Sequence, residues 1–243
     1  MKQQNCRILE NKAIAKDTYR MVLEGDGTVF SKPGMFLDLQ VPGYFLRRPI
    51  SILDHDGNTI SIIYKVIGHG TQTLATMERG MTLDTLLGLG NGYDTTLSGN
   101  HPTLIGGGSG IPPLYGLAKT LKREGKDVRV ILGFNQAEDV FCVDEFKALG
   151  CDVVLVTADG SLGRKGFGTD YLDDEPYTYL FACGPLMMLR TVDRIAKTSG
   201  QFSMEKRMGC GYGCCMGCSQ MTTEGPKRVC KEGPVFIREE IVW

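Results

Sequence analysis

Short runs of alternating apolar and polar residues, separated by turn residues, fill the first hundred positions of the chain. The strand-like runs are CRILENKAI, TYRMVLEG, MFLDLQV, ISILDHDGNTISIIYKV and TLDTLLGLG. Asp56-Gly57-Asn58 divides the fourth run into two β-rich halves, which is a hairpin signal. Closely spaced strands with few helical stretches predict an antiparallel barrel or sandwich over residues 1–100.

From residue 101 the period changes, because strand-like runs now alternate with helical ones. HPTLIGGG, DVRVILGFN, CDVVLVTA and YTYLFACGP are expected strands, and IPPLYGLAKTLKREGK, VDEFKALG and LMMLRTVDRIAKTSG are expected helices. This alternation predicts parallel βαβ units with right-handed crossovers over residues 101–200. Residues 201–243 are expected to form a third, small domain that builds no apolar core of its own and folds around a metal.

Composition and charge describe a globular protein and exclude several partners. The chain has 243 residues, 27 basic and 28 acidic, and the charges are interleaved, so neither a nucleic-acid patch nor a polybasic membrane segment is expected. The amino-terminal residues lack the apolar stretch of a signal peptide, and no run of about 18 apolar residues is present to span a membrane. A cytosolic location is therefore the default expectation.

Five of the nine cysteines fall within 21 residues near the carboxyl terminus, which indicates metal binding. Cys210, Cys215 and Cys218 have the spacing C-x4-C-x2-C, and Cys230 follows twelve residues later, as in plant-type [2Fe–2S] sites. Glycines between them let backbone amides turn toward the sulfurs. A structural zinc site is the alternative, although zinc prefers paired C-x2-C knuckles. Cys214 stands beside Cys215 and could replace it as a ligand.

A glycine loop follows the first strand of the predicted α/β region. In Leu104–Gly110, LIGGGSG, four glycines could let a pyrophosphate approach the backbone, and the next helix could offer its amides. These four are Gly106, Gly107, Gly108 and Gly110. The loop lacks the G-x-G-x-x-G spacing, so a tight turn without a ligand is the alternative, and no residue is identified that would read the nucleotide ribose.

Arg47-Arg48-Pro49-Ile50-Ser51 lies between two expected strands, where one arginine could bind a flavin pyrophosphate and Ser51 could approach the flavin ring. A charged barrel rim is the alternative. Downstream, Gly68-His69-Gly70-Thr71 precedes a helix-like stretch whose amino terminus could face phosphate. His69 is expected to be a loop residue without a chemical role.

Several other conspicuous residues have ordinary structural explanations. Cys6, Cys142 and Cys151 are isolated and are expected to be buried structural thiols. Met187 and Met188 begin a helix and are expected to lie in the core.

The order of these segments, from RRPIS through IYKV, GHGT, GGGSGIPPL and FACGP to the cysteines, resembles the ferredoxin–NADP reductase superfamily. Within it, nearly the whole chain is similar to the electron-transfer subunits of class 1B dihydroorotate dehydrogenases, whose tails carry CGxGxCxGC and a later cysteine. The resemblance implies an antiparallel FAD-binding β-barrel of six strands, a Rossmann-like parallel α/β NAD-binding domain and a small carboxyl-terminal [2Fe–2S] domain.

The resemblance also implies roles for individual residues. The flavin segments would be Arg48, Pro49, Ile50 and Ser51, then Ile63, Tyr64 and Lys65, and then Gly70 and Thr71. The glycine loop and Cys183, Gly184 and Pro185 would line the nicotinamide site, and Cys210, Cys215, Cys218 and Cys230 would hold the cluster. Cys214 departs from the family, in which a small residue such as alanine is more usual.

The resemblance implies electron flow from an FMN-containing catalytic subunit through [2Fe–2S] and FAD to NAD+, within a heterotetramer holding two copies of each subunit. Flavin is needed because nicotinamides exchange electron pairs and an iron–sulfur centre takes single electrons. No residue of this chain is required to act as an acid or a base. Two alternatives remain: the flavin and iron–sulfur subunit of another oxidoreductase, of ferredoxin–NADP or sulfide dehydrogenase type, and a non-catalytic zinc-binding regulator.

Overall fold

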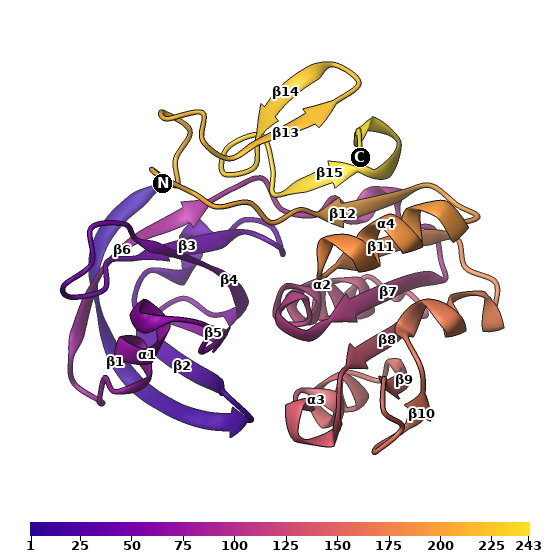
Figure 1. The fold of residues 1–243 in the computed structure, drawn as a ribbon, viewed down its shortest axis with the longest axis horizontal. Helices are drawn as coiled ribbons and strands as arrows, with labels where there is room; N and C mark the ends of the chain where they lie inside the picture. The colour runs from indigo at the N-terminus through magenta and orange to yellow at the C-terminus, as the bar shows by residue number, and fades with distance from the viewer.

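Six antiparallel strands close into a barrel in the amino-terminal part of a computed structural model that describes residues 1–243 (Figure 1). In spatial order these are β1 (Lys2–Ala15), β2 (Thr18–Glu24), β5 (Thr59–Lys65), β4 (Arg48–His55), β3 (Phe36–Leu39) and β6 (Thr82–Leu89). Helix α1 (His69–Ala75) lies between β5 and β6 in the sequence. Asp56 caps the predicted β4–β5 hairpin by accepting hydrogen bonds from the amides of Asn58 and Thr59. The predicted barrel is confirmed.

A seven-stranded sheet forms the second half of the molecule. Its order is β10 (Arg164–Lys165), β9 (Asp152–Thr157), β8 (Arg129–Phe134), β7 (Pro102–Gly107), β11 (Tyr179–Cys183), β12 (Gly200–Ser203) and β15 (Val235–Ile237). All neighbouring pairs are parallel except β12 and β15, which are antiparallel. The helices are α2 (Pro112–Arg123), α3 (Val143–Ala148) and α4 (Leu186–Ile195). The predicted βα alternation is confirmed.

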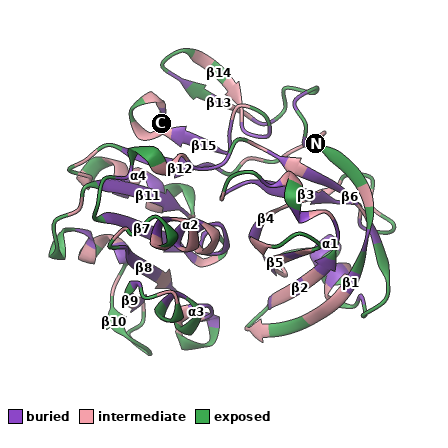
Figure 2. Ribbon diagram, turned by 180° about the vertical axis from the view of Figure 1, so that it is seen from behind, coloured by how far each residue is buried: buried purple, intermediate pink, exposed green.

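Successive residues of the central strands serve two separate cores. On β8, Val130 and Leu132 pack with the apolar face of α2, whereas Ile131 between them packs on the opposite side with Leu189 of α4. The strands β7 and β11 are buried along their whole length, as the purple ribbon in Figure 2 shows. Burial on both faces explains their continuous apolar sequences, since neither face of such a strand meets water.

The carboxyl-terminal residues do not form a separate body. Strands β12 and β15 belong to the large sheet, and only the hairpin of β13 (Ser219–Thr222) and β14 (Gly225–Arg228) projects from it (Figure 1). Residues 201–243 add to the core of the sheet and do not build a separate one. Their apolar side chains share the core beneath α4: Met204, Cys218, Val229, Cys230, Phe236 and Ile241. This short segment buries its apolar side chains because the chain returns to the sheet at β15 and packs on the face that α4 also covers.

Asn91 joins the end of the barrel to the returning chain. Its side chain donates to the carbonyls of Val235 (2.7 Å) and Glu232 (2.9 Å) and accepts from the Val235 amide (3.1 Å). Its own amide donates to the Gly233 carbonyl at 2.8 Å. Gly90 and Gly92 on either side have φ values of 78° and 72°, so this turn requires glycine. The sequence GLGNGYD is therefore a docking turn for the tail.

The barrel and the sheet meet along α2 and at the rim of the barrel. Lys119 of α2 pairs with Asp54 of β4, and Lys16 pairs with Glu138 at 3.0 Å. The Lys16 amide also donates to the Glu138 carbonyl at 2.8 Å. These contacts hold the rim of the barrel against the carboxyl ends of the sheet strands. No helix of the structure is both long enough and apolar enough to cross a membrane.

Replacement of Asn91 by Ala is expected to lower the free energy of unfolding by about 1–3 kcal/mol, because several partly buried hydrogen bonds of about 0.5–1.5 kcal/mol net are lost. Urea unfolding followed by circular dichroism measures the change. Asn58→Ala is the matched control, since Asn58 is an exposed turn residue whose side chain makes no hydrogen bond. An equal loss in both variants would contradict the docking role of Asn91.

Candidate functional site

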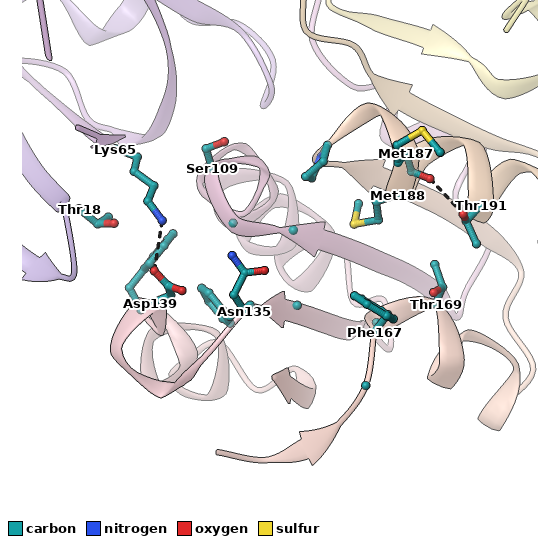
Figure 3. A pocket seen from close by; sticks show the side chains of 18 of the residues that line it. Thr18, Lys65, Ser109, Asn135, Asp139, Phe167, Thr169, Met187, Met188 and Thr191 are labelled. Atoms are coloured by element: carbon teal, nitrogen blue, oxygen red, sulfur yellow. Dashed lines mark hydrogen bonds and ion pairs between the residues drawn. The ribbon is translucent and has the colours of Figure 1, made fainter. Parts of the chain in front are cut away.

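A cavity of about 560 Å³ lies between the barrel and the carboxyl ends of the sheet strands (Figure 3). Open α/β sheets bind ligands at this edge. Its lining comes from β5, the glycine loop, and the segments that follow β8, β10 and β11. The predicted site residues that line it are Ile63, Tyr64, Lys65, Gly107, Gly108 and Pro185, and the residues that the sequence did not single out include Ser109, Asn135, Asp139, Phe141 and Phe167.

Only part of the glycine loop is open to the cavity. A Cβ atom on Gly106 would lie 2.9 Å from Ile111, and one on Gly110 would overlap the Cys183 carbonyl, so these glycines serve close packing. Gly108 has a φ of 50° and faces open space. Because Pro112 opens α2 and a second proline follows, the first helical positions carry no N–H, and a phosphate would have to use amides of the preceding turn.

The segment Cys183-Gly184-Pro185 divides between core and cavity. Burial raises the pKa of the Cys183 thiol to about 12, and this side chain lies among core residues beside Tyr93. A Cβ atom on Gly184 would meet Met188 at 2.5 Å. Pro185 alone of the three lines the cavity. Cys183 and Gly184 therefore position the loop and do not line the cavity.

The methionines at the start of α4 differ from expectation. Met187 is 65% exposed and, with Met188, lines the cavity. Placing Met187 in the core is therefore wrong, because the first turn of α4 faces the cavity while Leu189 and Val192 point into the sheet. The isolated thiols Cys6, Cys142 and Cys151 are buried, as predicted.

Two of the segments that are predicted to bind flavin meet through Arg48. A Cβ atom on Gly70, in the first turn of α1, would lie 2.5 Å from Arg48 Nε, so only glycine lets the guanidinium approach this helix. Arg48 also lies over the Tyr44 ring, 5.1 Å from its centroid, and its hydrogen bonds go to backbone carbonyls. Arg47 instead pairs with Asp84 at 2.8 Å. Arg48, which makes no ion pair, is thus the arginine free to bind an anion.

The other residues of these segments have distinct positions. Pro49, Ile50 and Ser51 follow Arg48 on β4 and are half-buried. The Thr71 hydroxyl accepts hydrogen bonds from the amides of Ile67 and Gly68 and donates to the Gly68 carbonyl, so it caps α1. This hydroxyl is already satisfied by the backbone.

Lys65 reaches across the cavity. Its Nζ lies 3.1 Å from Asp139 Oδ1, so the barrel and the sheet domain are linked by an ion pair at the cavity wall (Figure 3). Asp139 follows β8, the second strand of the first βαβ unit. Acidic residues near this point contact the ribose in dinucleotide-binding folds, so the position of Asp139 after β8 could have identified it from the sequence.

Backbone amides point at three of the clustered thiols. Cys210 Sγ accepts from the Cys214 amide at 3.2 Å, Cys215 Sγ from the Gly217 amide at 3.4 Å, and Cys218 Sγ from the Cys230 amide at 3.4 Å. Burial opposes ionisation of Cys210, but the amides of Cys215, Tyr212 and Cys214 outweigh it and lower the pKa of that thiol to about 6. Amides directed at sulfur favour the thiolate that metal binding requires.

The thiols are arranged as two pairs. Cys215 lies within hydrogen-bonding reach of Cys210, and Cys218 lies within reach of Cys230. Burial, followed by the Cys218 thiol, raises the pKa of Cys230 to about 12. No group of three or more His, Cys, Asp or Glu side chains is close enough together to hold one metal ion. Two irons take two thiolates each, whereas structural zinc takes four ligands around one point, so paired thiols fit the iron–sulfur alternative better.

Cys214 differs from its neighbours. Both thiols of the adjacent pair are exposed, but Cys215 Sγ accepts from the Gly217 amide and lies within reach of Cys210, whereas the Cys214 thiol interacts with the charge of Arg228. The Cys214 amide donates to Cys210 Sγ, and no backbone amide donates to the sulfur of Cys214 itself. This geometry favours Cys215 over Cys214 as the ligand.

The cysteine loop rests on the barrel at Asp38 of β3. This carboxyl is only 2% exposed, and burial raises its pKa to about 7 against the attraction of Arg47. Gly211 has a φ of 77°, and a Cβ atom there would overlap Asp38 Oδ2. The loop can therefore close onto the barrel only with glycine at this position.

Two family models match the chain. Residues 205–242 match the iron–sulfur cluster binding domain of dihydroorotate dehydrogenase B, and residues 104–194 match the oxidoreductase NAD-binding domain. The first match covers the paired thiols, and the second covers the glycine loop and the segments that line the sheet side of the cavity.

Curated relatives and solved structures agree with these matches. The dihydroorotate dehydrogenase B (NAD(+)) electron transfer subunit of Fusobacterium nucleatum is 37% identical over 99% of both chains, and that of Bacillus cereus is 40% identical over 100% of this chain and 99% of the relative. The structure of an NADH-dependent reduced ferredoxin–NADP oxidoreductase aligns with a TM-score of 0.89 at 27% identity, over 99% of this chain and 90% of that chain. Phthalate dioxygenase reductase, at 20% identity and a TM-score of 0.68, covers 85% of this chain and 70% of its own and shows the shared fold.

Sequence identity discriminates between a dihydroorotate dehydrogenase subunit and a subunit of a ferredoxin–NADP type oxidoreductase. Identity over the full length is higher to the dihydroorotate dehydrogenase subunits than to the ferredoxin–NADP oxidoreductase, so the latter alternative is not favoured. The chain belongs to the family of dihydroorotate dehydrogenase B (NAD(+)) electron transfer subunits.

Proposed function

We propose that this chain carries electrons from an FMN-containing dihydroorotate dehydrogenase catalytic subunit to NAD+, with FAD and one [2Fe–2S] cluster as its cofactors. The observation that carries the proposal is the order of neighbouring barrel strands. Asp38 of β3 touches the cysteine loop, β4 carries the flavin segment, and the end of β5 lines the cavity. Pro49 is the cross-strand partner of Asp38. The three sites are therefore neighbours in the order that the electrons would follow.

The flavin site would use a cation and a helix terminus. Arg48 would bind the FAD pyrophosphate, because its guanidinium makes no ion pair and lies against the first turn of α1. Thr71 would hold that turn, and Ser51 and Tyr64 would border the ring. When bound, flavin exchanges electron pairs with nicotinamide and single electrons with iron–sulfur centres.

The nucleotide site would be the cavity. Gly107 and Gly108 would admit the pyrophosphate, and Pro185 would border the nicotinamide. The Asp139 carboxylate would compete with a 2′-phosphate for space and for Lys65, which supports NAD as the nucleotide.

The cluster would be held by Cys210 and Cys215 on one iron and by Cys218 and Cys230 on the other. The amides directed at the sulfurs fit such a group because they stabilise its negative charge. These thiols lie near a surface that also exposes Tyr212, Met216 and Met221. We propose this surface as the docking site of the catalytic subunit, in a heterotetramer of the two subunits.

Serine variants test the ligand assignment. Cys215→Ser is expected to lose most of the iron and the visible cluster absorbance, because one iron loses a thiolate. Cys214→Ser is the matched control and is expected to keep both, since no backbone amide is directed at its sulfur and it is not part of either thiol pair. Iron analysis of anaerobically purified protein measures the difference. The opposite result would make Cys214 the ligand.

Gly110→Ala tests the nucleotide site. The added methyl would collide with the Cys183 carbonyl and displace the glycine loop, so NADH binding is expected to weaken by about tenfold, or about 1.4 kcal/mol. Isothermal titration measures the affinity. Gly57→Ala, at a turn with nothing within 4 Å of the new methyl, is expected to bind NADH normally. Unchanged affinity in a folded Gly110→Ala protein would remove the loop from the proposed site.

The complete reaction tests the function. Reduction of NAD+ by dihydroorotate is expected to require both this chain and its catalytic partner, and light scattering of the purified complex is expected to give the mass of the heterotetramer. NAD+ reduction that proceeds equally well without this chain would refute the proposal.

A further inference from the structure

Arg228, the last residue of β14, contacts both segments that carry the clustered cysteines. Its Nη1 donates to the Gly213 carbonyl at 2.5 Å, in the loop between Cys210 and Cys215. Its own carbonyl accepts from the amides of Lys231 (3.0 Å), Glu232 (2.9 Å) and Gly233 (3.2 Å), which form the turn around Cys230. One residue thus holds the first loop through its side chain and the second turn through its backbone.

Glu232 fixes the orientation of the Arg228 side chain. Arg228 Nε donates to Glu232 Oε2 at 2.9 Å, the Arg228 amide donates to the same oxygen at 2.7 Å, and Nη2 pairs with Oε1. Both side chains are about one-quarter to one-third exposed. A bidentate ion pair of this kind leaves the guanidinium few alternative orientations, so Nη1 stays directed at the Gly213 carbonyl.

The backbone at Gly213 shows that the two segments lie directly against each other. Gly213 has a φ of 95°, and a Cβ atom there would lie 2.6 Å from Lys231 Cδ. Since the two segments are separated by the whole β13–β14 hairpin, their closeness depends on tertiary contacts. Arg228 supplies a side-chain hydrogen bond from this turn to the Gly213 carbonyl, and the Gly213 amide is directed in return at the Cys230 sulfur.

We propose that Arg228 is a positioning residue for the [2Fe–2S] cluster, which ties the loop of Cys210 and Cys215 to the turn of Cys230 and places a positive charge beside the thiolates. The inference rests on the proposed function, because it requires the cluster. The charge of Arg228 lies close enough to Cys230 and Cys214 to interact with their sulfurs. A neighbouring cation favours the reduced cluster, which carries one more negative charge, so it raises the reduction potential.

The test compares three variants of the full chain, each purified anaerobically with its cofactors. Arg228→Met removes both the charge and the hydrogen bonds, whereas Arg228→Lys keeps the charge and loses the bidentate ion pair with Glu232. Lys227→Met is the matched control, because Lys227 is the adjacent residue and pairs with Glu224 and Glu240, away from the cysteine loop. The two readouts are the rate of iron release to a chelator and the midpoint potential from a titration followed by electron paramagnetic resonance.

Iron release is expected to be about tenfold faster in both Arg228 variants, as for lost supporting contacts at other metal sites. The potential is expected to become more negative in Arg228→Met and to stay near that of the parent in Arg228→Lys. A folded Arg228→Met protein with normal FAD content and no cluster would also support the proposal. If Arg228→Met does not fold, the rate of iron release from Arg228→Lys tests the proposal by itself.

Parent-like iron release in both Arg228 variants, or in Arg228→Lys alone where the other does not fold, would overturn the inference. So would an equally fast release from Lys227→Met. A parent chain that binds no iron–sulfur cluster would instead refute the proposed function, so the two failures are distinguishable.

Discussion

The antiparallel pairing of β15 with β12 is the contact on which the arrangement of the sites depends. Phe202 lies opposite Phe236, and both are buried in the core beneath α4. Because the chain leaves the sheet at β12 and returns beside it at β15, residues 204–234 form a long connection whose two ends are fixed at the same edge of the sheet. Asn91 then fastens the returning end to the exit of the barrel. The cysteine segment is consequently held over β3 by apolar burial and hydrogen bonds.

The barrel and the sheet have different tasks in this arrangement. The parallel strands all end at one edge, so their loops supply glycines, an acid and apolar side chains to one cavity. The antiparallel strands β3, β4 and β5 lie side by side and face three different neighbours: the cysteine loop, the first turn of α1 and the cavity. Electron transfer between cofactors needs short separations, and adjacent strands of one barrel provide a rigid means of keeping them.

Much of this could be predicted because the determining signals are local. The alternation of Met21 and Leu23 in β2, the Asp56 turn and the C-x4-C-x2-C spacing each depend on neighbours a few residues away. Other features could not be predicted. Met187 begins an amphipathic helix, but only the packing of α4 decides that its first turn faces the cavity. Gly106 and Gly110 look like ligand-binding glycines, although both are required for contacts between the loop and the core.

The sequence by itself determined the strand and helix order, the presence of two differently patterned halves and the clustered cysteines, since periodicity and motif spacing are properties of short stretches. Only the tertiary structure decided which arginine is free, which thiols lie in pairs, and that residues 201–243 share the core of the sheet. Each of these depends on a partner outside the local stretch: Asp84 for Arg47, Cys230 for Cys218, and Phe202 for Phe236. No local pattern encodes the distance between such partners, because folding alone brings them together.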